Sequence, residues 1–488
     1  MIIRGTTNTV LVSQLSSLHS PILCIRSCRR RLTLLSRTSG RRIAVHMSAS
    51  GVITGGNTDE NRGVNTGMES EASARAGVAE FDPTQAKEAI ERSGVVEGVG
   101  KVNSREDVPH ADAAWTWFKG RMNSAKYWVA PMVDQSELAF RMLCKAHGAE
   151  AAYTPMLHAR IFNENAAYRE EHFTSTFDHP SKDRPLLAQF CANDPDILLN
   201  AARHVEPYVD GVDINLGCPQ RIAKKGRYGS FLMNDIPLVE SMVRKLADNL
   251  SVPVTVKIRR FPDLQETVEY AARLEKAGAS LVAVHGRTRE EKRAKSSMAC
   301  WETIAAVKKA LHVPVLANGN LRNIQDVHYC LDATGADGVM SAEALLEDPA
   351  MFSSRRLETP YSPIEGPTML LEYCDMLDLY STPGRMIKGH AFSLLNPWLA
   401  EFVDLREELH RTRMSAVAIR EFTERVIARI EEIERKESRR HPIPALSKRK
   451  LETMEREMAK KAAIAEQQRM ESLETPDGVE VTNQRLAG

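Results

Sequence analysis

The sequence predicts an α/β protein built around a (β/α)8 barrel of parallel strands, followed by a smaller all-helical domain. Short apolar runs begin at Tyr127 and alternate with amphipathic stretches of helical period. Eight such units fit into about 230 residues, and a barrel of this kind typically needs ~250. After Met351 the strand signals stop and helix-like segments take over.

The N-terminal segment has the composition of a targeting leader. The first acidic residue is Asp59, and the preceding residues are rich in Arg, Ser and Thr. This pattern is typical of a transit peptide, so we expect residues 1–46 to direct the protein to a plastid or mitochondrion. The alternative is a disordered basic tail or an extension before a start at Met47, which would leave the protein in the cytoplasm or nucleus. Residues 47–110 indicate a flexible linker with one helix around Asp82 to Ser93.

The barrel domain is expected to span residues 120–355. Its strands should be short apolar runs bounded by turn residues. In order, these runs are Tyr127–Met132, Ala151–Met156, Pro185–Cys191, Gly211–Gly217, Pro253–Ile258, Ser280–Gly286, Pro314–Asn318 and Gly338–Ser341. A doubly wound sheet is the alternative, but no GxGxxG motif follows the first run.

The segments between these runs have the apolar spacing of amphipathic helices. They are Glu137–His147, Asp196–Tyr208, Leu238–Leu250, Thr267–Ala277, Trp301–Leu311 and Ile324–Asp332. Strands that alternate with helices in this way imply a parallel sheet, because each helix carries the chain back to the start of the next strand.

Residues 367–440 are expected to form the helical domain, with helices at 369–379, 386–395 and 416–433. Its basic residues are Arg385, Lys388, His390, Arg406, Arg411, Arg413, Arg420, Arg425 and Arg429. They favour either a tRNA-binding face or a solvated surface of i,i+4 ion pairs, and charge alone does not decide between the two. Residues 441–488 indicate a charged tail, a frayed helix followed by disorder.

Composition excludes several classes of protein. The net charge of +1 gives no whole-chain signal for nucleic acid, and the eight cysteines form no CxxC pair. We therefore expect no metal site and no disulfide framework, and a reducing compartment fits better. No apolar run reaches the roughly 18 residues that span a bilayer, so we expect no membrane contact. We also expect a monomer.

One run ends on a cysteine. In Asp213-Ile-Asn-Leu-Gly-Cys-Pro219, apolar and polar residues alternate with the period of a strand, and Gly217 and Pro219 end it. Cys218 then lies at the C-terminal tip, where barrels of this class carry their chemistry. A cysteine is otherwise most often a small buried hydrophobic residue.

Other polar residues end neighbouring runs. Gln189, Lys257 and His285 are hard to explain as packing, because burying an unpaired Lys is costly. The seventh run ends on Asn318-Gly-Asn320 and the eighth on Ser341-Ala-Glu343, where these barrels commonly bind a phosphate. The set suits FMN. Lys257 would stabilise the reduced ring, Gln189 would meet its edge, and Pro131-Met132 would form an apolar wall.

Six ordered motifs then closely resemble the tRNA-dihydrouridine synthases. They are Val129-Ala-Pro-Met-Val-Asp134, Ala188-Gln-Phe-Cys191, Asn215-Leu-Gly-Cys-Pro-Gln220, Val256-Lys-Ile-Arg259, His285-Gly-Arg-Thr288 and Ala317-Asn-Gly-Asn320. Residues 215–226 and 339–343 resemble the eukaryotic type that acts on D-loop positions 16 and 17. The resemblance covers residues 126–352 closely and the helical domain more loosely.

The resemblance implies FMN-dependent reduction of the C5=C6 bond of uridine in tRNA, with NADPH or NADH as reductant. Hydride would pass from flavin N5 to C6, and Cys218 would donate a proton to C5. The residues implied to hold FMN are Pro131, Met132, Val133, Gln189, Lys257, His285, Asn318, Gly319, Asn320, Ala342 and Glu343. Asn215 and Arg287 would contact the substrate. Many members of the family have Gly-Arg where this chain has Ala342-Glu343, so backbone donors would have to bind the phosphate here.

Two further interpretations of the chain remain open. A flavin oxidoreductase for a free small molecule, such as a dihydropyrimidine, would use the same barrel, although the helical domain favours a macromolecular substrate. A non-catalytic RNA-binding protein would keep the barrel as a scaffold. The segment Lys224–Arg227 is expected to be either a mobile basic loop that closes over the base or an ordinary solvated turn.

Overall fold

The computed structural model describes residues 82–174, 182–291 and 297–443. The expected leader (1–46), most of the expected linker and nearly all of the expected charged tail lie outside these ranges. The described residues belong to one compact unit, Met68–Gly488.

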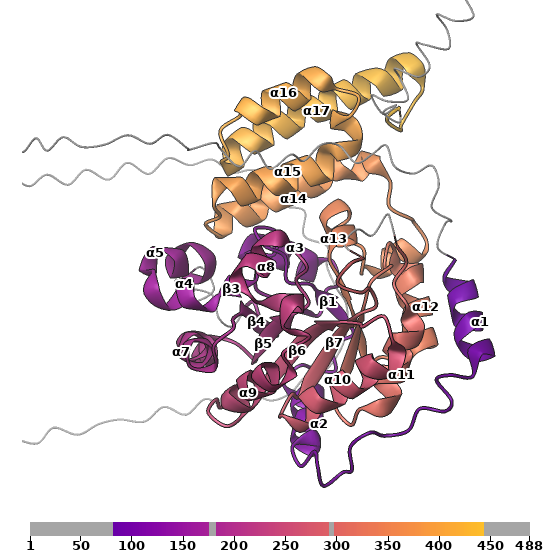
Figure 1. The fold of residues 1–488 in the computed structure, drawn as a ribbon. Coiled ribbons are helices and arrows are strands. Elements are labelled where there is room, and N and C mark those ends of the chain that lie inside the picture. The colour runs from indigo at the N-terminus through magenta and orange to yellow at the C-terminus, as the bar shows by residue number, and fades with distance from the viewer. Residues whose placement is uncertain (1–81, 175–181, 292–296, 444–488) are drawn as a thin grey trace, which may run out of the picture. The chain divides into compact units, whose positions relative to one another are not determined.

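The strands form a closed parallel barrel, as predicted (Figure 1). Neighbouring strands follow the order β2-β1-β9-β8-β7-β6-β5-β4, and the pairing of β2 with β4 closes the ring. Each of the eight predicted runs coincides with one of these strands, and β6 extends one residue beyond its run, to Arg259. The two-residue β3, which pairs with the end of β4, was not predicted. The strands are β1 (Tyr127–Val129), β2 (Ala151–Tyr153), β3 (Leu157–His158), β4 (Leu186–Cys191), β5 (Gly211–Leu216), β6 (Val254–Arg259), β7 (Leu281–His285), β8 (Val315–Asn318) and β9 (Gly338–Ser341).

Helices surround the barrel, and the six predicted ones are confirmed. They are α3 (Leu138–Ala146), α7 (Pro195–Val205), α9 (Ile236–Ala247), α10 (Leu264–Lys276), α11 (Trp301–Ala310) and α12 (Ile324–Thr334). Shorter elements in the loops were not predicted: α4 (Ala159–Glu164), α5 (Ala166–Arg169), η2 (Glu170–Thr174), η3 (Glu206–Tyr208), α8 (Arg221–Gly226), η4 (Gly229–Leu232), α13 (Glu343–Glu347), η5 (Ser354–Leu357) and η6 (Pro363–Glu365).

The sequence fixes the ends of several helices through local caps. Before α7, the Asp194 carboxylate accepts from the amides of Asp196 and Ile197, and Pro195 occupies the first turn. Before α12, the Asn323 side chain accepts from the amide of Asp326, and Gly335 ends the helix in the left-handed region. These caps satisfy backbone groups that a free helix end would leave unpaired.

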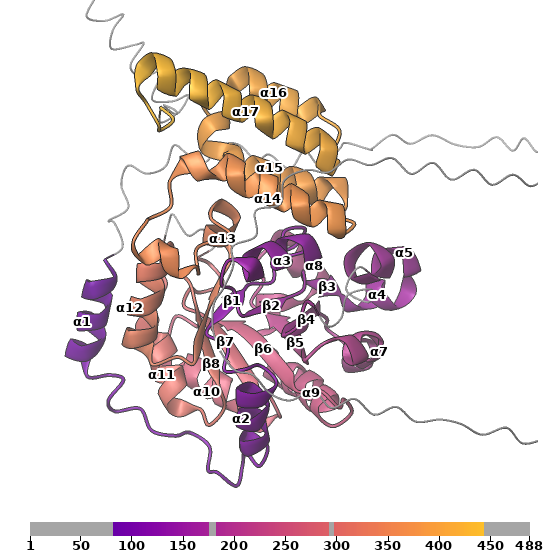
Figure 2. The ribbon, with the colours of Figure 1, turned by 180° about the vertical axis from the view of Figure 1, so that it is seen from behind.

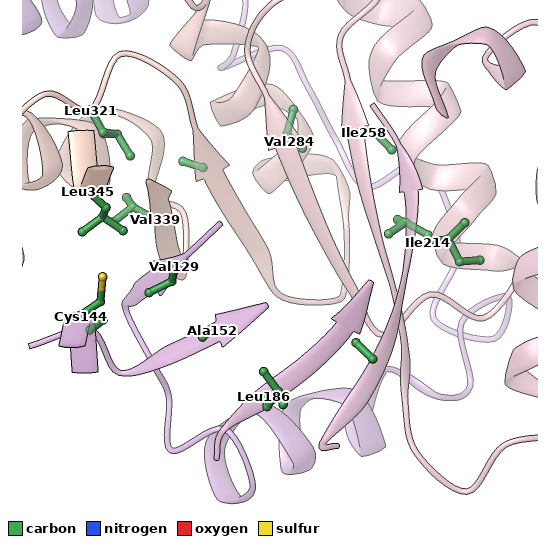
Figure 3. Packing of buried hydrophobic residues seen from close by; sticks show 14 of the residues in the cluster. Val129, Cys144, Ala152, Leu186, Ile214, Ile258, Val284, Leu321, Val339 and Leu345 are labelled. Carbon is green, nitrogen blue, oxygen red and sulfur yellow. The ribbon is translucent and has the colours of Figure 1, made fainter. Parts of the chain in front are cut away.

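Two apolar layers result from the period-two alternation of the strands. Outward-facing residues such as Val129, Ile214 and Ile258 join the surrounding helices in one large buried cluster (Figure 3). Trp128 and Leu187 belong to a second, smaller cluster inside the barrel, together with Leu316, Met340 and residues of α2. The interior is therefore filled at one end by apolar side chains.

Helix α2 (Ala111–Gly120) closes the N-terminal end of the barrel and was not predicted. Its Phe118 packs in the interior cluster. The indole of Trp115 donates to the His312 carbonyl over 2.7 Å, and the indole of Trp117 donates to the Asp210 carbonyl over 2.8 Å. Because His312 and Asp210 precede β8 and β5, α2 covers the mouth opposite the strand tips. Helix α2 therefore blocks the approach of a ligand to the interior from the N-terminal end.

The described part of the expected linker packs on the barrel helices. The helix expected around Asp82 to Ser93 is α1 (Pro83–Ser93), which lies beside α12 (Figure 2). Further along, the Asn103 amide donates over 2.8 Å to both the Ala272 carbonyl and the Glu275 carboxylate. Residues 82–110 therefore follow the outer surface of the barrel.

The helical domain contains the three predicted helices and one more. It comprises α14 (Gly366–Leu379), α15 (Gly384–Leu399), α16 (Val403–Arg411) and α17 (Ala416–Glu437), of which α16 was not predicted. Arg420 binds Asp375 and Asp378 on another helix, and Arg429 binds Asp404 over 2.6 Å. Much of the basic charge here thus joins helices to each other, and the tRNA-binding role of the domain stays a prediction.

Three findings concern the described residues as a group. None of their helices is both long enough and apolar enough to cross a bilayer. No cluster of three or more His, Cys, Asp or Glu side chains within these ranges has the arrangement of a metal site. The six cysteines in them are free thiols.

Candidate active site

The predicted polar residues meet inside the open end of the barrel. On each strand, the alternation that turns Ile214 and Ile258 outward turns Asn215 and Lys257 inward. The register places Asn215 opposite Lys257 on the neighbouring strand, and His285 opposite Asn318. Residues more than 100 positions apart in the chain therefore line one rim. Their location is as predicted, and their individual roles stay predictions.

The backbone of Cys218 is fixed by side chains on both sides. The Asn215 Oδ1 atom accepts from the Cys218 amide over 2.9 Å and from the Gly217 amide over 3.2 Å. From the other side, the amide and hydroxyl of Ser230 donate to the Cys218 carbonyl over 3.1 and 3.0 Å. Burial raises the pKa of the Cys218 thiol above its ordinary value. The half-buried thiol therefore keeps its proton at neutral pH.

A chain of hydrogen bonds behind Asn215 orients that side chain. The Gln189 Oε1 atom accepts from the Asn215 amide over 2.8 Å, and the Gln189 Nε2 donates to Asp213 over 2.8 Å. Thr255 donates its hydroxyl to the other Asp213 oxygen over 2.6 Å. Burial raises the pKa of Asp213 to about 7. Asp213 thus orients the side-chain amide of Gln189. Gln189 in turn orients the side-chain amide of Asn215, which holds the backbone of Cys218.

Two cationic side chains follow on β6. The Lys257 Nζ donates to Asn318 Oδ1 over 3.1 Å, and Asn318 is held by its own donation to the Met340 carbonyl. Burial, together with the charge of Arg259, lowers the pKa of Lys257 to about 8. Arg259 donates to the Gly217 carbonyl over 2.9 Å, so it also supports the cysteine loop. Burial and the charge of Arg287 lower the pKa of Arg259 to about 10.

Arg287 joins His285 to the loop after β8. Its guanidinium donates to His285 Nε2 over 3.0 Å and to Asn320 Oδ1 over 2.5 Å. Burial lowers the pKa of His285 well below its ordinary value, and the cations Lys257, Arg259 and Arg287 add to the effect. His285 is therefore neutral and accepts at Nε2. At this buried end of the barrel, an anionic ligand would offset the cost of burying these cations and reduce their mutual repulsion.

The lack of a side chain at Gly319 lets the loop after β8 lie closer to Ala299 and His285 than any other residue would permit. Its φ is +111°, and a Cβ atom there would lie 2.7 Å from the Ala299 Cβ and 3.1 Å from the His285 ring. The backbone of this loop can therefore lie directly against a phosphate or against the imidazole.

We expect Gly319→Ala to lower the free energy of unfolding by about 1–3 kcal/mol more than Gly335→Ala does, because the new methyl must displace its neighbours. Gly335 is the matched control, since it has a φ of +62° with no atom within 4 Å of the added Cβ. Urea unfolding of both variants measures the difference. Equal losses would show that the close contacts at Gly319 relax without cost.

Some predicted residues lie near the rim without joining this network. No hydrogen bond or ion pair within the described ranges links Pro131, Met132 or Val133 to the other predicted residues, and Val133 is exposed. Ala342 precedes the short helix α13, of which Glu343 is the first residue. Glu343 is exposed and acts on Arg287 through charge alone, raising the pKa that burial lowers.

One expectation for this region is wrong, and several residues were missed. Lys224–Gly226 do not form a loop but end the short helix α8, which packs against η4. The sequence also gave no role to Asp213, Arg259 or Ser230. Asp213 and Arg259 lie two residues from Asn215 and Lys257, so the period of the strand would have placed them in the same interior. Ser230 carries no comparable signal, because its partner is a backbone carbonyl.

Comparison with known proteins agrees with this geometry. The model of the family described as "Dihydrouridine synthase (Dus)" matches residues 128–379. A rat protein named tRNA-dihydrouridine(16/17) synthase [NAD(P)(+)]-like is 47% identical over 292 residues, which are 60% of this chain and 65% of the rat protein. The chain thus matches less than two thirds of that relative's length.

Two further relatives are named for different positions in tRNA. The Schizosaccharomyces pombe tRNA-dihydrouridine(16/17) synthase [NAD(P)(+)] is 46% identical over 60% of this chain and 74% of its own length. The human tRNA-dihydrouridine(20a/20b) synthase [NAD(P)+]-like is 41% identical over 47% of this chain and 71% of its own length.

Proposed function

The chain belongs to the dihydrouridine synthase family, and we propose that it reduces the C5=C6 bond of uridine at D-loop positions 16 and 17 of tRNA, with FMN as cofactor and NADPH or NADH as reductant. The observation that carries the proposal is the convergence of buried cations and a protonated thiol on the open end of the barrel. The choice of positions follows the relatives named for 16/17, which have higher identity to this chain and match a larger share of it.

The residues at the rim fit FMN. The Gly319 loop offers backbone close to where a phosphate would bind, and Arg287 and His285 lie beside it. Lys257, with a lowered pKa and one hydrogen bond to Asn318, can meet the negative edge of a reduced flavin. Gln189 keeps one amide hydrogen and one lone pair for the ring edge. Pro131 and Met132 remain proposed as an apolar wall.

The protein's own residues supply the other half of the reaction. FMN, when bound, supplies the hydride that reaches C6 of uracil. Reduction also needs a proton at C5, and the Cys218 thiol can donate it because its pKa is raised. Asn215 holds the Cys218 amide and Ser230 its carbonyl, so the thiol is directed before substrate arrives. The uridine must leave its stack to reach this interior, as base-modifying enzymes require.

The pH dependence of proton donation follows from the raised pKa of Cys218. Only the protonated thiol donates, so we expect the single-turnover rate to stay constant at neutral pH and to fall only above the ordinary thiol pKa of ~8.5. Dihydrouridine formation by pre-reduced enzyme, followed from pH 6 upward, measures this profile. Cys218→Ser should lose the alkaline fall together with most of the rate. A fall already at neutral pH would contradict proton donation by this thiol.

The proposed reaction is tested directly in two steps. The purified protein should carry flavin absorbance, and NADPH should bleach it. Position-by-position mapping of dihydrouridine in organellar and cytosolic tRNA from cells that lack the protein should show loss at 16 and 17, restored by the wild-type gene. Colourless protein that does not take up FMN, or unchanged dihydrouridine at both positions, would overturn the proposal.

The compartment and assembly belong to the same proposal. We place the enzyme in a plastid or mitochondrion, on the composition of residues 1–46, which lie outside the described residues. Fusion of these residues to a fluorescent protein tests the location, and a diffuse cytoplasmic or nuclear signal would contradict it. The enzyme is proposed to act as a monomer, which sedimentation of the purified chain would show.

A further inference from the structure

A polar cavity lies next to the cysteine loop. It has a volume of about 250 Å³, and its polar or aromatic lining consists of His158, Arg160, Asn193, Lys225, Arg227 and Tyr228. These residues come from β3, α4, the loop after β4 and the end of α8. In both views, β3, α4 and α8 lie on the same side of the barrel (Figures 1 and 2).

Tyr228 separates this cavity from the reacting thiol. Its buried ring forms a cluster with Cys191 and Ala223, and Cys218 packs against that cluster. The His158 ring meets Tyr228 edge to face at 5.5 Å, and the Asn193 amide donates to the Gly226 carbonyl over 3.0 Å. The walls are thus held in place by contacts within the protein. Tyr228 thus lies between the cavity and Cys218.

The charge of the cavity is uncompensated. Arg160, Lys225 and Arg227 are exposed, and within the described residues none of them has an ion pair or a side-chain hydrogen bond. None of the described residues that line the cavity carries a carboxylate. In the helical domain, by contrast, Arg420 and Arg429 bind carboxylates of other helices. An anion is therefore the ligand that this cavity can pair with.

Arg227 adds a second indication. Its φ is +50°, in the left-handed region where an arginine is strained and where Gly or Asn is preferred. A charged, exposed side chain at such a position, on the edge of the cavity, is consistent with a function for it. The size of the cavity also limits its ligand. At about 250 Å³ it falls below the ~300–1,000 Å³ of sites for whole small molecules, so it suits a single phosphate group with its waters.

We propose that this cavity binds a backbone phosphate of the substrate RNA, at a linkage adjoining the uridine that Cys218 protonates. The assignment rests on the proposed function for the identity of the RNA. Guanidinium groups pair with phosphate oxygens through two parallel hydrogen bonds, and Lys225 contributes a third positive charge. Anchoring the linkage would hold the strand while the base enters the barrel. The 2′-phosphate of NADPH is the other possible source of the same chemical group, and the experiment separates the two.

The test uses the full-length holoenzyme and a D-arm stem-loop RNA. We expect Arg160→Ala, Lys225→Ala and Arg227→Asn each to weaken RNA binding about tenfold, as loss of a charged hydrogen bond predicts. The slope of log affinity against log salt should fall by about 0.7 per removed cation. Asn is chosen at 227 because it tolerates the left-handed backbone. Arg244→Ala on α9 is the matched control, since Arg244 is exposed and lies outside the cavity, and it should leave affinity unchanged.

A modified RNA identifies the phosphate. Replacing a linkage beside the target uridine with an uncharged methylphosphonate should weaken binding to wild type and to Arg244→Ala equally, and should weaken binding to Arg160→Ala less, because one of the three cations that meet this phosphate is already absent there. Equal additional losses in all three would overturn the assignment. Raised KM for NADPH but not for NADH, with RNA affinity unchanged, would assign the cavity to the nicotinamide cofactor. Because RNA affinity is measured without turnover, the result stands even if wild type forms no dihydrouridine.

Discussion

Replacing Cys218 with alanine is expected to lower the rate of dihydrouridine formation by about 10²–10⁴-fold, the usual contribution of a general acid. The reason is structural. Cys218 is half-buried at the end of β5, its backbone is held by Asn215 and Ser230, and burial keeps its proton in place at neutral pH. Single-turnover reduction of tRNA by pre-reduced enzyme measures the loss. FMN content and flavin reduction by NADPH should be unchanged, because neither needs a proton at C5.

Cys330→Ala provides the control for loss of a thiol. Cys330 is fully buried in α12, away from the rim. The Cys330→Ala variant should therefore be less stable than wild type but have the same turnover. An unchanged rate in Cys218→Ala would remove the acid from the mechanism. The interpretation as a non-catalytic RNA-binding protein would be supported only if the wild-type protein also formed no dihydrouridine while still binding tRNA.

Replacing Glu137 with alanine is expected to lower the free energy of unfolding by about 3–5 kcal/mol. The substitution removes the buried carboxylate whose hydrogen bonds join the barrel to the helical domain. Glu137 precedes α3 and accepts from the Tyr373 hydroxyl over 2.6 Å and from His390 Nε2 over 3.0 Å. His390 is fully buried and stacks on Phe140 with ring centroids 4.2 Å apart. Without Glu137, Tyr373 and His390 would keep buried polar atoms with no acceptor.

Glu372→Ala is the matched control for this variant. Glu372 also joins α14 to α3, through His147, but its side chain is 38% exposed. An exposed pair of this kind contributes about 0–1 kcal/mol. Urea unfolding of both variants measures the contrast, and similar small losses would show that the Glu137 contacts add no stability. If the helical domain binds tRNA, Glu137→Ala should also raise KM for tRNA while flavin reduction by NADPH stays normal.

These contacts also change how the helical domain can be tested. Truncation before Pro367 would separate a tRNA substrate from a free small molecule if the barrel were independent. The structure shows that truncation would expose the buried surface of α3 and leave Glu137 without its donors. Loss of activity would then report misfolding as well as substrate choice. Point variants of exposed cations avoid this ambiguity.

The sequence by itself determined the eight barrel strands, the six helices between them and the end of the barrel at which the candidate site residues meet. These features are local, because strands show a period of two and helices a period of 3.6. The end of each apolar run also marks the C-terminal end of its strand. Lys257 and His285 were found because they lie near the ends of their apolar runs. Asp213 faces inward as well, but it lies near the start of its run and was given no role.

Only the tertiary structure decided which side chains pair. Closure of the barrel brings Gln189 to Asn215, Lys257 to Asn318 and Arg287 to Asn320, and these pairings depend on register between strands that no local pattern records. The α2 helix that closes the N-terminal mouth and the cavity beside Tyr228 likewise depend on contacts between distant segments. Burial, which raises the pKa of Cys218 and lowers that of Lys257, exists only once the chain has folded around them.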